Sequence, residues 1–331
     1  MERRNFGKTR LLVTPLGIGL AALGRPGYIN LGHAQDLSET YEVEAMQAHA
    51  FAVLDEAWRQ GVRYFDAARS YGRAEQFLGN WLRSREIDPG SVAVGSKWGY
   101  TYTAGWQVEA EKHEVKEHSL AVLRRQWQET QANLGSYLGL YQIHSATLES
   151  GVLENQQVLE ELERLKGTGV AIGLTLSGAN QADVLYKALE IKSNSGLLFD
   201  SVQATWNLLE RSVEPALQAA HAAGMGVIVK EALANGRLTP RNQEPDFAPK
   251  LQILQQEARR FETTIDALAL AVVIHRSWSS IVLSGAATVD HMRLNAGALN
   301  VQLDELAEDR LLALVEPAGQ YWGERSELAW N

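Results

Sequence analysis

A short apolar run rich in β-branched residues, followed by a longer amphipathic stretch, recurs eight times along the chain. Ile/Val-rich runs that alternate with helices indicate a parallel sheet buried on both faces. Eight such units without a Pro/Ser-rich linker favour a closed barrel over an open doubly wound sheet. The runs lie at 15–21, 62–68, 91–97, 138–144, 170–175, 201–206, 226–231 and 280–285. The helix-like stretches lie, for example, at 42–60, 73–85, 118–134, 153–167, 180–193, 212–223, 261–276 and 289–299.

The length of the chain agrees with a single large domain. Its 331 residues could form two average domains, but α/β barrels also reach about 250 residues or more as one unit. We therefore predict one α/β domain over residues 1–331, a (β/α)8 TIM barrel. Residues 303–331 follow the eighth unit and are expected to form a C-terminal helical tail, whereas the proline-rich segment 239–250 is expected to be a loop.

Charge and cysteine content exclude several functions. The chain has 31 Lys and Arg against 40 Asp and Glu, and its formal net charge is −9, so nucleic acid is not an expected partner. It contains no cysteine, which excludes disulfides and thiolate metal sites. No stretch of 18 or more residues is wholly apolar, and the first ten residues lead into no signal-peptide-like region. We expect a soluble cytoplasmic protein with no membrane partner.

Two motifs resemble ligand sites but do not fit their requirements. GIGLAALG (17–24) satisfies the dinucleotide fingerprint as a string, but the following RPGYINLG would break the helix that the fingerprint needs. We therefore interpret it as a barrel strand and its loop. HEVKEH (113–118) resembles a zinc motif, but its histidines are five positions apart and would diverge by about 140° on a helix. We interpret it as a solvated charged face, and we predict no metal.

Four polar residues end four of the apolar runs, namely Asp66, Lys97, His144 and Gln203. In a barrel of this type the chemistry lies at the C-terminal ends of the strands. Each residue also has a structural explanation, such as a helix cap for Asp66, a surface position for Lys97 or a hydrogen-bonded core position for His144. Charged groups at the ends of apolar strands are nevertheless unfavourable unless they are paired with another group or serve a function. Tyr71, five positions after Asp66, is either a half-buried aromatic residue or part of the same site.

The motifs around these residues resemble those of the aldo-keto reductase family. FDAARSYG, VGSKWG and LYQIHSA are similar to the family's motifs after the second strand and at the ends of the third and fourth. GKTRLLVTPLGIGLAALG is similar to its N-terminal β-hairpin and first strand, and GRLT and GAATVDHMRLNAGAL resemble its cofactor segments. The resemblance covers Gly7 to about Asn300, with the motifs in the family's order.

The resemblance implies a catalytic tetrad of Asp66, Tyr71, Lys97 and His144. A nicotinamide cofactor would transfer hydride to a carbonyl carbon while Tyr71 protonates the oxygen, or the reverse with Tyr71 as base. We expect the ammonium of Lys97 to lower the pKa of Tyr71, because a cation favours the phenolate. Asp66 would keep Lys97 charged, and His144 would hydrogen-bond the substrate oxygen.

The cofactor segments depart from the family pattern. Thr175 and Leu176 replace the usual Ser-Asn pair, and Lys230 and Glu231 replace an aromatic residue that stacks on the nicotinamide, a role that Trp206 could take. Alanines follow the glycine of the phosphate-clamp segment, so the choice between NADP(H) and NAD(H) stays open. The cofactor-binding residues carried over are Gly19, Leu20, Thr175, Gln203, Trp206, Lys230, Glu231, Leu233, Gly236, Gly285, Ala286, His291 and Asn295.

Two long loops, at 25–40 and 98–106, are expected to cover the mouth of the barrel. Trp98, Tyr100 and Trp106 would give the substrate pocket apolar faces with polar rims, although they could equally pack the second loop down. The predicted function is reduction of an aldehyde or ketone, or oxidation of the matching alcohol, by an NAD(P)(H)-dependent oxidoreductase. Two alternatives stay open. One is a non-catalytic, cofactor-sensing regulatory subunit on the same fold, and the other is a barrel hydrolase that uses Asp66 and His144.

Overall fold

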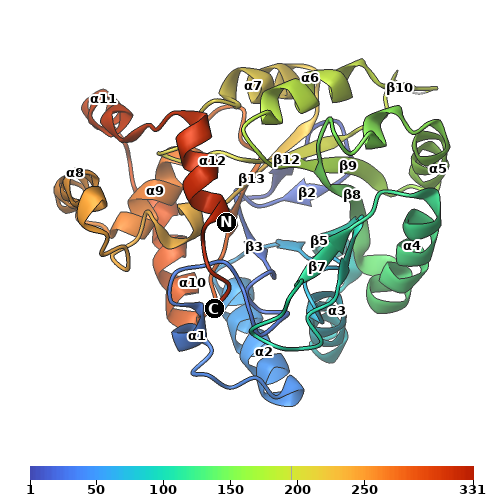
Figure 1. Ribbon diagram of the computed structural model, residues 1–331, viewed down its shortest axis with the longest axis horizontal. Coiled ribbons are helices and arrows are strands. Elements are labelled where there is room, and N and C mark those ends of the chain that lie inside the picture. Colours follow the sequence, from blue (N-terminus) through green and yellow to red (C-terminus); the bar gives the residue numbers. More distant parts are fainter. Residues whose placement is uncertain (195) are drawn as a thin grey trace.

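The fold is a closed barrel of eight parallel strands surrounded by helices (Figure 1). The computed structural model describes residues 1–194 and 196–331. Strand β14 pairs with β3, and this contact, which aligns Val282 with Leu16, closes the barrel. The strands are β3 (Leu16–Gly19), β4 (Tyr64–Asp66), β5 (Ala93–Trp98), β8 (Leu138–Ala146), β9 (Ala171–Leu176), β12 (Ser201–Thr205), β13 (Gly226–Lys230) and β14 (Ile281–Ser284). All eight predicted runs are strands of this barrel, so the predicted fold class is confirmed.

The N-terminal end of the barrel is closed by a hairpin of two short strands, β1 (Arg4–Asn5) and β2 (Leu12–Val13). Phe6 and Val13 of this hairpin are fully buried in a cluster with the first residues of several barrel strands, including Tyr64 and Ile281. The ring of Phe6 lies against Gly226 at the start of β13, where a larger residue would clash with it. The hairpin therefore fills the bottom of the barrel, and the cavity described below opens at the opposite end.

The helices that cover the barrel lie where the sequence pattern predicts them. A second and larger apolar cluster fills the space between these helices and the strands. Side chains of Ser119, Asn155, Thr264 and Thr288 cap four of the helices. The eight helices are α2 (Val43–Arg59), α3 (Ala74–Ser84), α4 (Leu120–Leu134), α5 (Gln156–Lys166), α6 (Gln181–Glu190), α7 (Glu214–Ala222), α9 (Ile265–Ile274) and α10 (Val289–Ala296).

The remaining elements lie in the loops and the tail. The predicted tail contains two helices, α11 (Glu305–Leu311) and α12 (Ala318–Ser326). Helix α8 (Ala248–Arg260) begins within the segment 239–250 that was expected to be a loop. Pro249 does not prevent this helix, because it stands in the first turn, where proline is tolerated. The short helix α1 (His33–Asp36) lies in the loop after β3. Short 3-10 helices occupy 89–91, 135–137, 152–154, 234–236, 245–247, 297–300 and 312–314, and a small hairpin joins β10 (Lys192–Ser193) to β11 (Gly196–Leu197).

The segment 113–118 is not a helix, and His118 at its end is buried rather than solvated. Its residues Glu114–Lys116 form strand β7, which pairs antiparallel with β6 (Tyr100–Tyr102) after β5. Within the described residues, no group of three or more His, Cys, Asp or Glu side chains is arranged to hold a metal ion. GIGLAALG contains strand β3 followed by a turn, as predicted, and no helix opens there.

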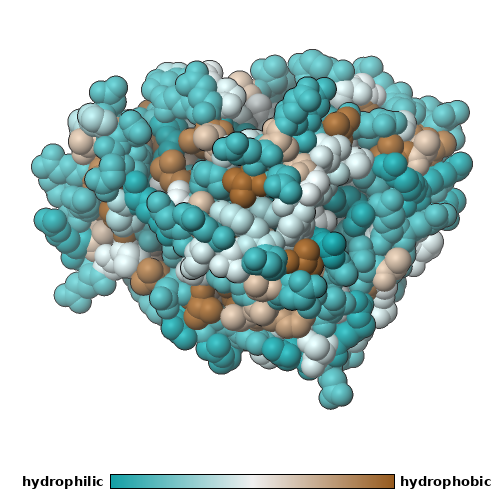
Figure 2. Space-filling view, turned by 60° about the horizontal axis from the view of Figure 1, so that its bottom comes forward, coloured by the Kyte–Doolittle hydropathy of each residue, from teal (hydrophilic) through white to brown (hydrophobic). Residues whose placement is uncertain are grey.

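Figure 2 shows a mainly hydrophilic surface on which hydrophobic residues are scattered in small groups. Across the part of the chain that the structure describes, no helix has both the length and the apolar character needed to span a membrane.

Glu75 of α3 joins two helices to the barrel through a buried polar network. Its side chain is almost fully buried and accepts hydrogen bonds from Ser96 of β5 at 2.6 Å and from Thr130 of α4 at 2.7 Å. Its other oxygen accepts from Asn133 at 3.1 Å and from the guanidinium of Arg69 at 2.7 Å. Removing a buried charge from such a network leaves several donors without partners.

We expect Glu75→Ala to lower the free energy of unfolding by about 3 kcal/mol, as measured by urea denaturation. Glu129→Ala is the matched control, because Glu129 is a partly exposed carboxylate that also pairs with Arg69. The control should change the free energy by less than about 1 kcal/mol. Equal effects of the two substitutions would contradict the role assigned to Glu75.

Candidate active site

A buried ion pair lies at the C-terminal end of the barrel, between Lys97 at the end of β5 and Asp66 at the end of β4. The two side chains are 0% and 2% exposed, and the ammonium donates to a carboxylate oxygen of Asp66 and, at 2.9 Å, to the carbonyl of Ala67. The other oxygen of Asp66 accepts from the amide of Gln203 at 3.0 Å and from the hydroxyl of Tyr64 at 3.1 Å. These contacts compensate for the removal of both charges from water.

Tyr71 lies beside this pair, on the turn that connects β4 to α3. The turn is fixed by a backbone hydrogen bond from Tyr71 to Ala68 at 3.1 Å. The centre of the Tyr71 ring is 4.7 Å from the Lys97 ammonium nitrogen. It is also 5.5 Å from the centre of the His144 imidazole, in an edge-to-face arrangement. The structure thus brings the four residues of the predicted tetrad together.

The pKa of Tyr71 is raised well above its ordinary value of 10, chiefly by burial and then by the nearby carboxylate of Asp66. The guanidinium of Arg25 opposes this effect. The net pKa is therefore raised rather than lowered as expected, because burial outweighs the effect of the nearby cation Arg25. The phenol is protonated at neutral pH, which is the form that a proton donor requires.

His144, near the end of β8, is buried and uncharged. Burial, then the cations Lys97 and Arg25, hold the pKa of its imidazole well below the ordinary 6.5. Its Nδ1 lies 3.4 Å from the hydroxyl oxygen of Ser70, and its ring centre lies 4.9 Å from that of Tyr100. A neutral imidazole has one N–H, which can donate a hydrogen bond to an oxygen in the cavity.

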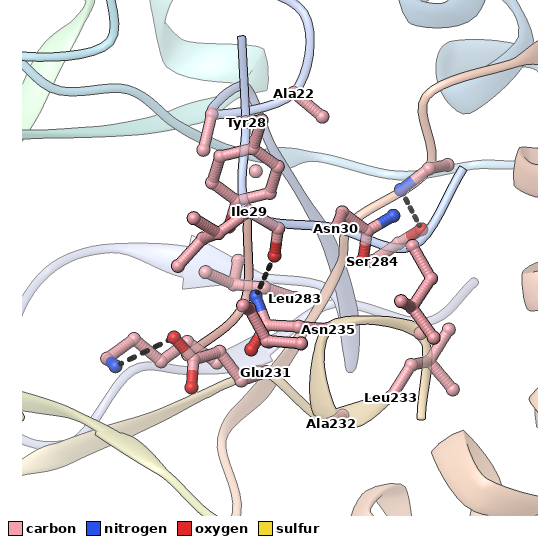
Figure 3. Close-up of a pocket in the computed structure, with 18 of the residues that line it drawn as sticks. Ala22, Tyr28, Ile29, Asn30, Glu231, Ala232, Leu233, Asn235, Leu283 and Ser284 are labelled. Carbon is pink, nitrogen blue, oxygen red and sulfur yellow. Dashed lines mark hydrogen bonds and ion pairs between the residues drawn. The ribbon is translucent and has the colours of Figure 1, made fainter. Parts of the chain in front are cut away.

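A cavity of about 570 Å³ opens from these residues. Its wall includes Tyr71, His144 and the loops after β13 and β14, and its far end reaches Arg241 and helix α10. Figure 3 shows how the loops on two sides of the cavity are joined: the Asn235 amide donates to the carbonyl of Ile29 at 2.9 Å. The volume is within the ordinary range for cofactor and small-molecule sites.

Most of the residues predicted to bind cofactor line this cavity, but three do not. Leu20 and Trp206 are fully buried outside it, and the Trp206 indole N–H is directed to Glu214 at 3.2 Å. The hydroxyl oxygen of Thr175 accepts from the backbone of Ser145 at 2.7 Å, which leaves Ser177 as a cavity residue after β9. The predicted residues that line the cavity are Gly19, Gln203, Lys230, Glu231, Leu233, Gly236, Gly285, Ala286, His291 and Asn295.

Of the three aromatic residues predicted to form the substrate pocket, only Tyr100 lines the cavity. The expectation is wrong for Trp98 because side chains alternate along β5, so that Lys97 faces the barrel interior and Trp98 is buried on the outer face. It is also wrong for Trp106, whose indole N–H donates to the carbonyl of Tyr41 at 2.6 Å and whose ring packs against Phe77.

Glu231, which directly follows Lys230 at the end of β13, is neutralised in part by the C-terminal tail. Arg325 of α12 donates to both oxygens of Glu231, at 2.5 Å and 2.9 Å, while Lys230 lies 3.6 Å from the same carboxylate. These cations and the hydrogen bond from Thr205 outweigh burial and lower the pKa of Glu231 to about 2. Burial lowers the pKa of Lys230 to about 8.

Several cavity residues come from loops and the tail, where no local sequence pattern predicts them. Arg25 is 3% exposed, donates to the carbonyl of Ser70 and to Glu114 of β7, both at 3.0 Å, and lies 5.2 Å from the Tyr71 ring centre. Trp330 stacks on His113 with 3.9 Å between ring centres. Loop 25–40 is predicted to cover the cavity, but no local signal in the sequence identifies Arg25, Arg325 or Trp330.

Two features of the cavity fit a polar ligand such as a dinucleotide. Buried oxygens of Asn235 and Asp266 have no hydrogen-bond partner among the residues that the structure describes. The loop after β13 also holds three non-glycine residues in the left-handed region, namely Glu231, Ala234 and Asn235, with φ of 56°, 49° and 54°. Such backbone conformations carry strain and concentrate at ligand-binding sites.

Fold and site together place the chain among the (β/α)8-barrel proteins whose titratable side chains gather at the C-terminal rim. The model of the aldo/keto reductase family matches residues 15–315, and the chain belongs to this family. The family and the names of the relatives identify it as an oxidoreductase.

Similar proteins are found in several bacteria. The chain is 23% identical to an uncharacterized oxidoreductase, YqkF, of Bacillus subtilis, over 95% of each chain. It is 25% identical to pyridoxal 4-dehydrogenase of Microbacterium luteolum, over 89% of this chain and 92% of the relative. The holo-form structure of the aldo-keto reductase AKR11C1 from Bacillus halodurans superposes with a TM-score of 0.74 at 22% identity, covering 97% of this chain and 99% of the other. This last similarity supports the fold.

Three buried histidines near the cavity are neutral in the folded protein. His33 and His118 have their pKa lowered to about 4 by burial, and the pKa of His144 is also lowered. In the unfolded chain these imidazoles bind protons near pH 6.5. Below that pH the unfolded state therefore takes up more protons than the folded state, and the protein loses stability as the pH falls.

We expect the free energy of unfolding to fall by about 2 kcal/mol for His33 alone between pH 7 and pH 5. His33→Phe should remove this part of the pH dependence, as measured by urea denaturation at the two pH values. His221→Phe, at an exposed position of α7, is the control and should leave the pH dependence unchanged. An unaltered slope in His33→Phe would contradict the assignment.

Proposed function

We propose that this protein is an NAD(P)(H)-dependent oxidoreductase that reduces an aldehyde or ketone, or oxidises the matching alcohol, with Tyr71 as general acid and base. The observation that carries the proposal is the buried Lys97–Asp66 pair with Tyr71 beside it and His144 across from it, all at one end of the cavity. The cavity accommodates a small carbonyl or alcohol substrate next to these groups.

The residues that would hold the cofactor are those on the cavity wall after β13 and β14. Glu231, Asn235 and Asn295 present polar groups there, and Gly285 leaves open space beside them. Asn295 is held in place by a hydrogen bond from its amide to Ser284 at 2.9 Å. When bound, the nicotinamide supplies the hydride that a carbonyl carbon receives, or accepts it from an alcohol.

The chain itself supplies the proton and the positioning. Tyr71 donates its hydroxyl proton to the carbonyl oxygen as negative charge develops there, and the nearby ammonium of Lys97 stabilises the resulting phenolate. Asp66 keeps Lys97 protonated and in place. His144 donates a hydrogen bond to the same oxygen from its one N–H, which orients the carbonyl toward the hydride donor.

We expect Tyr71→Phe to lower kcat by a factor of about 10² to 10⁴, because the proton donor is lost. The assay follows the loss of reduced-nicotinamide absorbance with a panel of aldehydes and ketones. The dissociation constant of the cofactor, measured by fluorescence titration, should change less than about threefold, because Tyr71 does not hold the cofactor by a charge.

Tyr100→Phe is the matched control, because Tyr100 is a cavity phenol whose ring lies beside His144. Its kcat should stay within about tenfold of the parent value. Cofactor binding with no turnover, and no effect of Tyr71→Phe on any property, would instead favour a non-catalytic regulatory subunit. Turnover in the absence of nicotinamide would favour hydrolase chemistry.

A further inference from the structure

The cavity has a second end, remote from the predicted tetrad. Its wall there is formed by Leu31, by Thr239 to Arg241, by Asp266 at the start of α9, and by residues of α10 including His291. A dinucleotide with its nicotinamide beside Tyr71 would extend along this cavity. Its second nucleoside would then lie at the end that contains Arg241 and Asp266.

Arg241 is the cation of this end, but its guanidinium is already engaged. One terminal nitrogen donates to the carboxylate of Asp36 at 2.8 Å and to the carbonyls of Leu31 and Gly32 at 3.0 Å and 3.2 Å. The other donates to the second oxygen of Asp36 and lies 3.3 Å from His291. The carboxylate of Asp36 is 2% exposed, so the pair is bidentate and largely shielded from water.

Asp266 adds a negative charge that is only partly compensated. One of its carboxylate oxygens is buried and has no hydrogen-bond partner within the described part of the chain, although Asp266 lies on the cavity wall. Burial raises its pKa to about 6, so the group is mostly ionised at pH 7.5. An unpartnered carboxylate oxygen is an acceptor for a hydroxyl group and repels a phosphate.

The other basic groups near this end do not supply a phosphate site. Arg293 lies on the outer side of α10, where it pairs with Glu56 at 3.3 Å and with Asp290 at 3.1 Å, and it does not line the cavity. Burial lowers the pKa of His291 below its ordinary value, so its imidazole is neutral at pH 7.5. Asp36, Asp266 and Arg241 together carry a net charge of about −1.

We infer that this cavity selects NAD(H) and disfavours NADP(H). Asp36 occupies the guanidinium that a 2′-phosphate would need, and Asp266 offers its free oxygen to a ribose hydroxyl. The same logic, a carboxylate for a ribose hydroxyl and an unpaired arginine for a phosphate, separates the two cofactors in dinucleotide-binding folds of another architecture. The inference rests on the proposed function, because it requires that a nicotinamide dinucleotide occupies the cavity.

The experiment is a fluorescence titration of the purified full-length chain with NADH and, separately, with NADPH at pH 7.5. NADH should bind at least about tenfold more tightly. Asp36→Asn frees Arg241 from its carboxylate and should tighten NADPH about tenfold while NADH changes less than about threefold. Asp266→Asn removes a repulsive charge and should shift the ratio in the same direction.

Arg293→Ala is the control, because this exposed arginine lies outside the cavity. It should leave both dissociation constants unchanged, whereas a loss of NADPH affinity would show that Arg293 is a phosphate ligand and would contradict the inference. Should Asp36→Asn unfold loop 25–40, Asp266→Asn alone still tests the assignment. Tighter binding of NADPH than of NADH overturns the inference and leaves the proposed function intact. Failure to bind either dinucleotide overturns both.

Discussion

The Lys97–Asp66 ion pair is the interaction on which the proposed chemistry depends. Neither charge is tolerable alone at such burial, because transfer of an unpaired ion from water to a protein interior is strongly unfavourable. Each group therefore fixes the other, and the amide of Gln203 fixes Asp66 from across the barrel. The pair exists because β4 and β5 are adjacent and end at the same rim, with Asp66 and Gly95 in register. The barrel thus holds the ammonium of Lys97 beside the phenol of Tyr71, which lies on the turn after β4.

The barrel and the strand-end positions of Asp66, Lys97 and His144 could be predicted because their signals are local, whereas the role of Tyr71 was implied by the resemblance to the family. A run of apolar residues with a charged residue at its end identifies both a strand and the rim of the barrel, as in VGSKWG and LYQIHSA. The same alternation of side chains that directs Lys97 inward directs Trp98 outward, so Trp98 does not share the environment of the loop that follows it. The six residues of HEVKEH were too few to show a strand period. Their pairing with Tyr100–Tyr102 bridges about a dozen residues, and no local pattern reveals it.

The parts of the site that could not be predicted come from segments distant in sequence. Arg325 and Trp330 reach the cavity from the tail, and Arg25 reaches it from the loop after the first strand. Their partners, Glu231, His113 and Glu114, lie in other elements. Arg325 and Arg25 are each paired with a carboxylate. A cavity rich in ionised groups therefore carries little net charge. Fixed, paired charges of this kind need little rearrangement when charge develops in a reaction.

The N-terminal hairpin affects the side from which ligands can enter and leave the barrel. Because Phe6 and Val13 fill the bottom of the barrel, the cavity that contains Tyr71 lies at the opposite end. Under the proposed function, a nicotinamide dinucleotide and a small carbonyl substrate would enter this cavity from the same side, so the molecule that lies deeper would enter first and leave last.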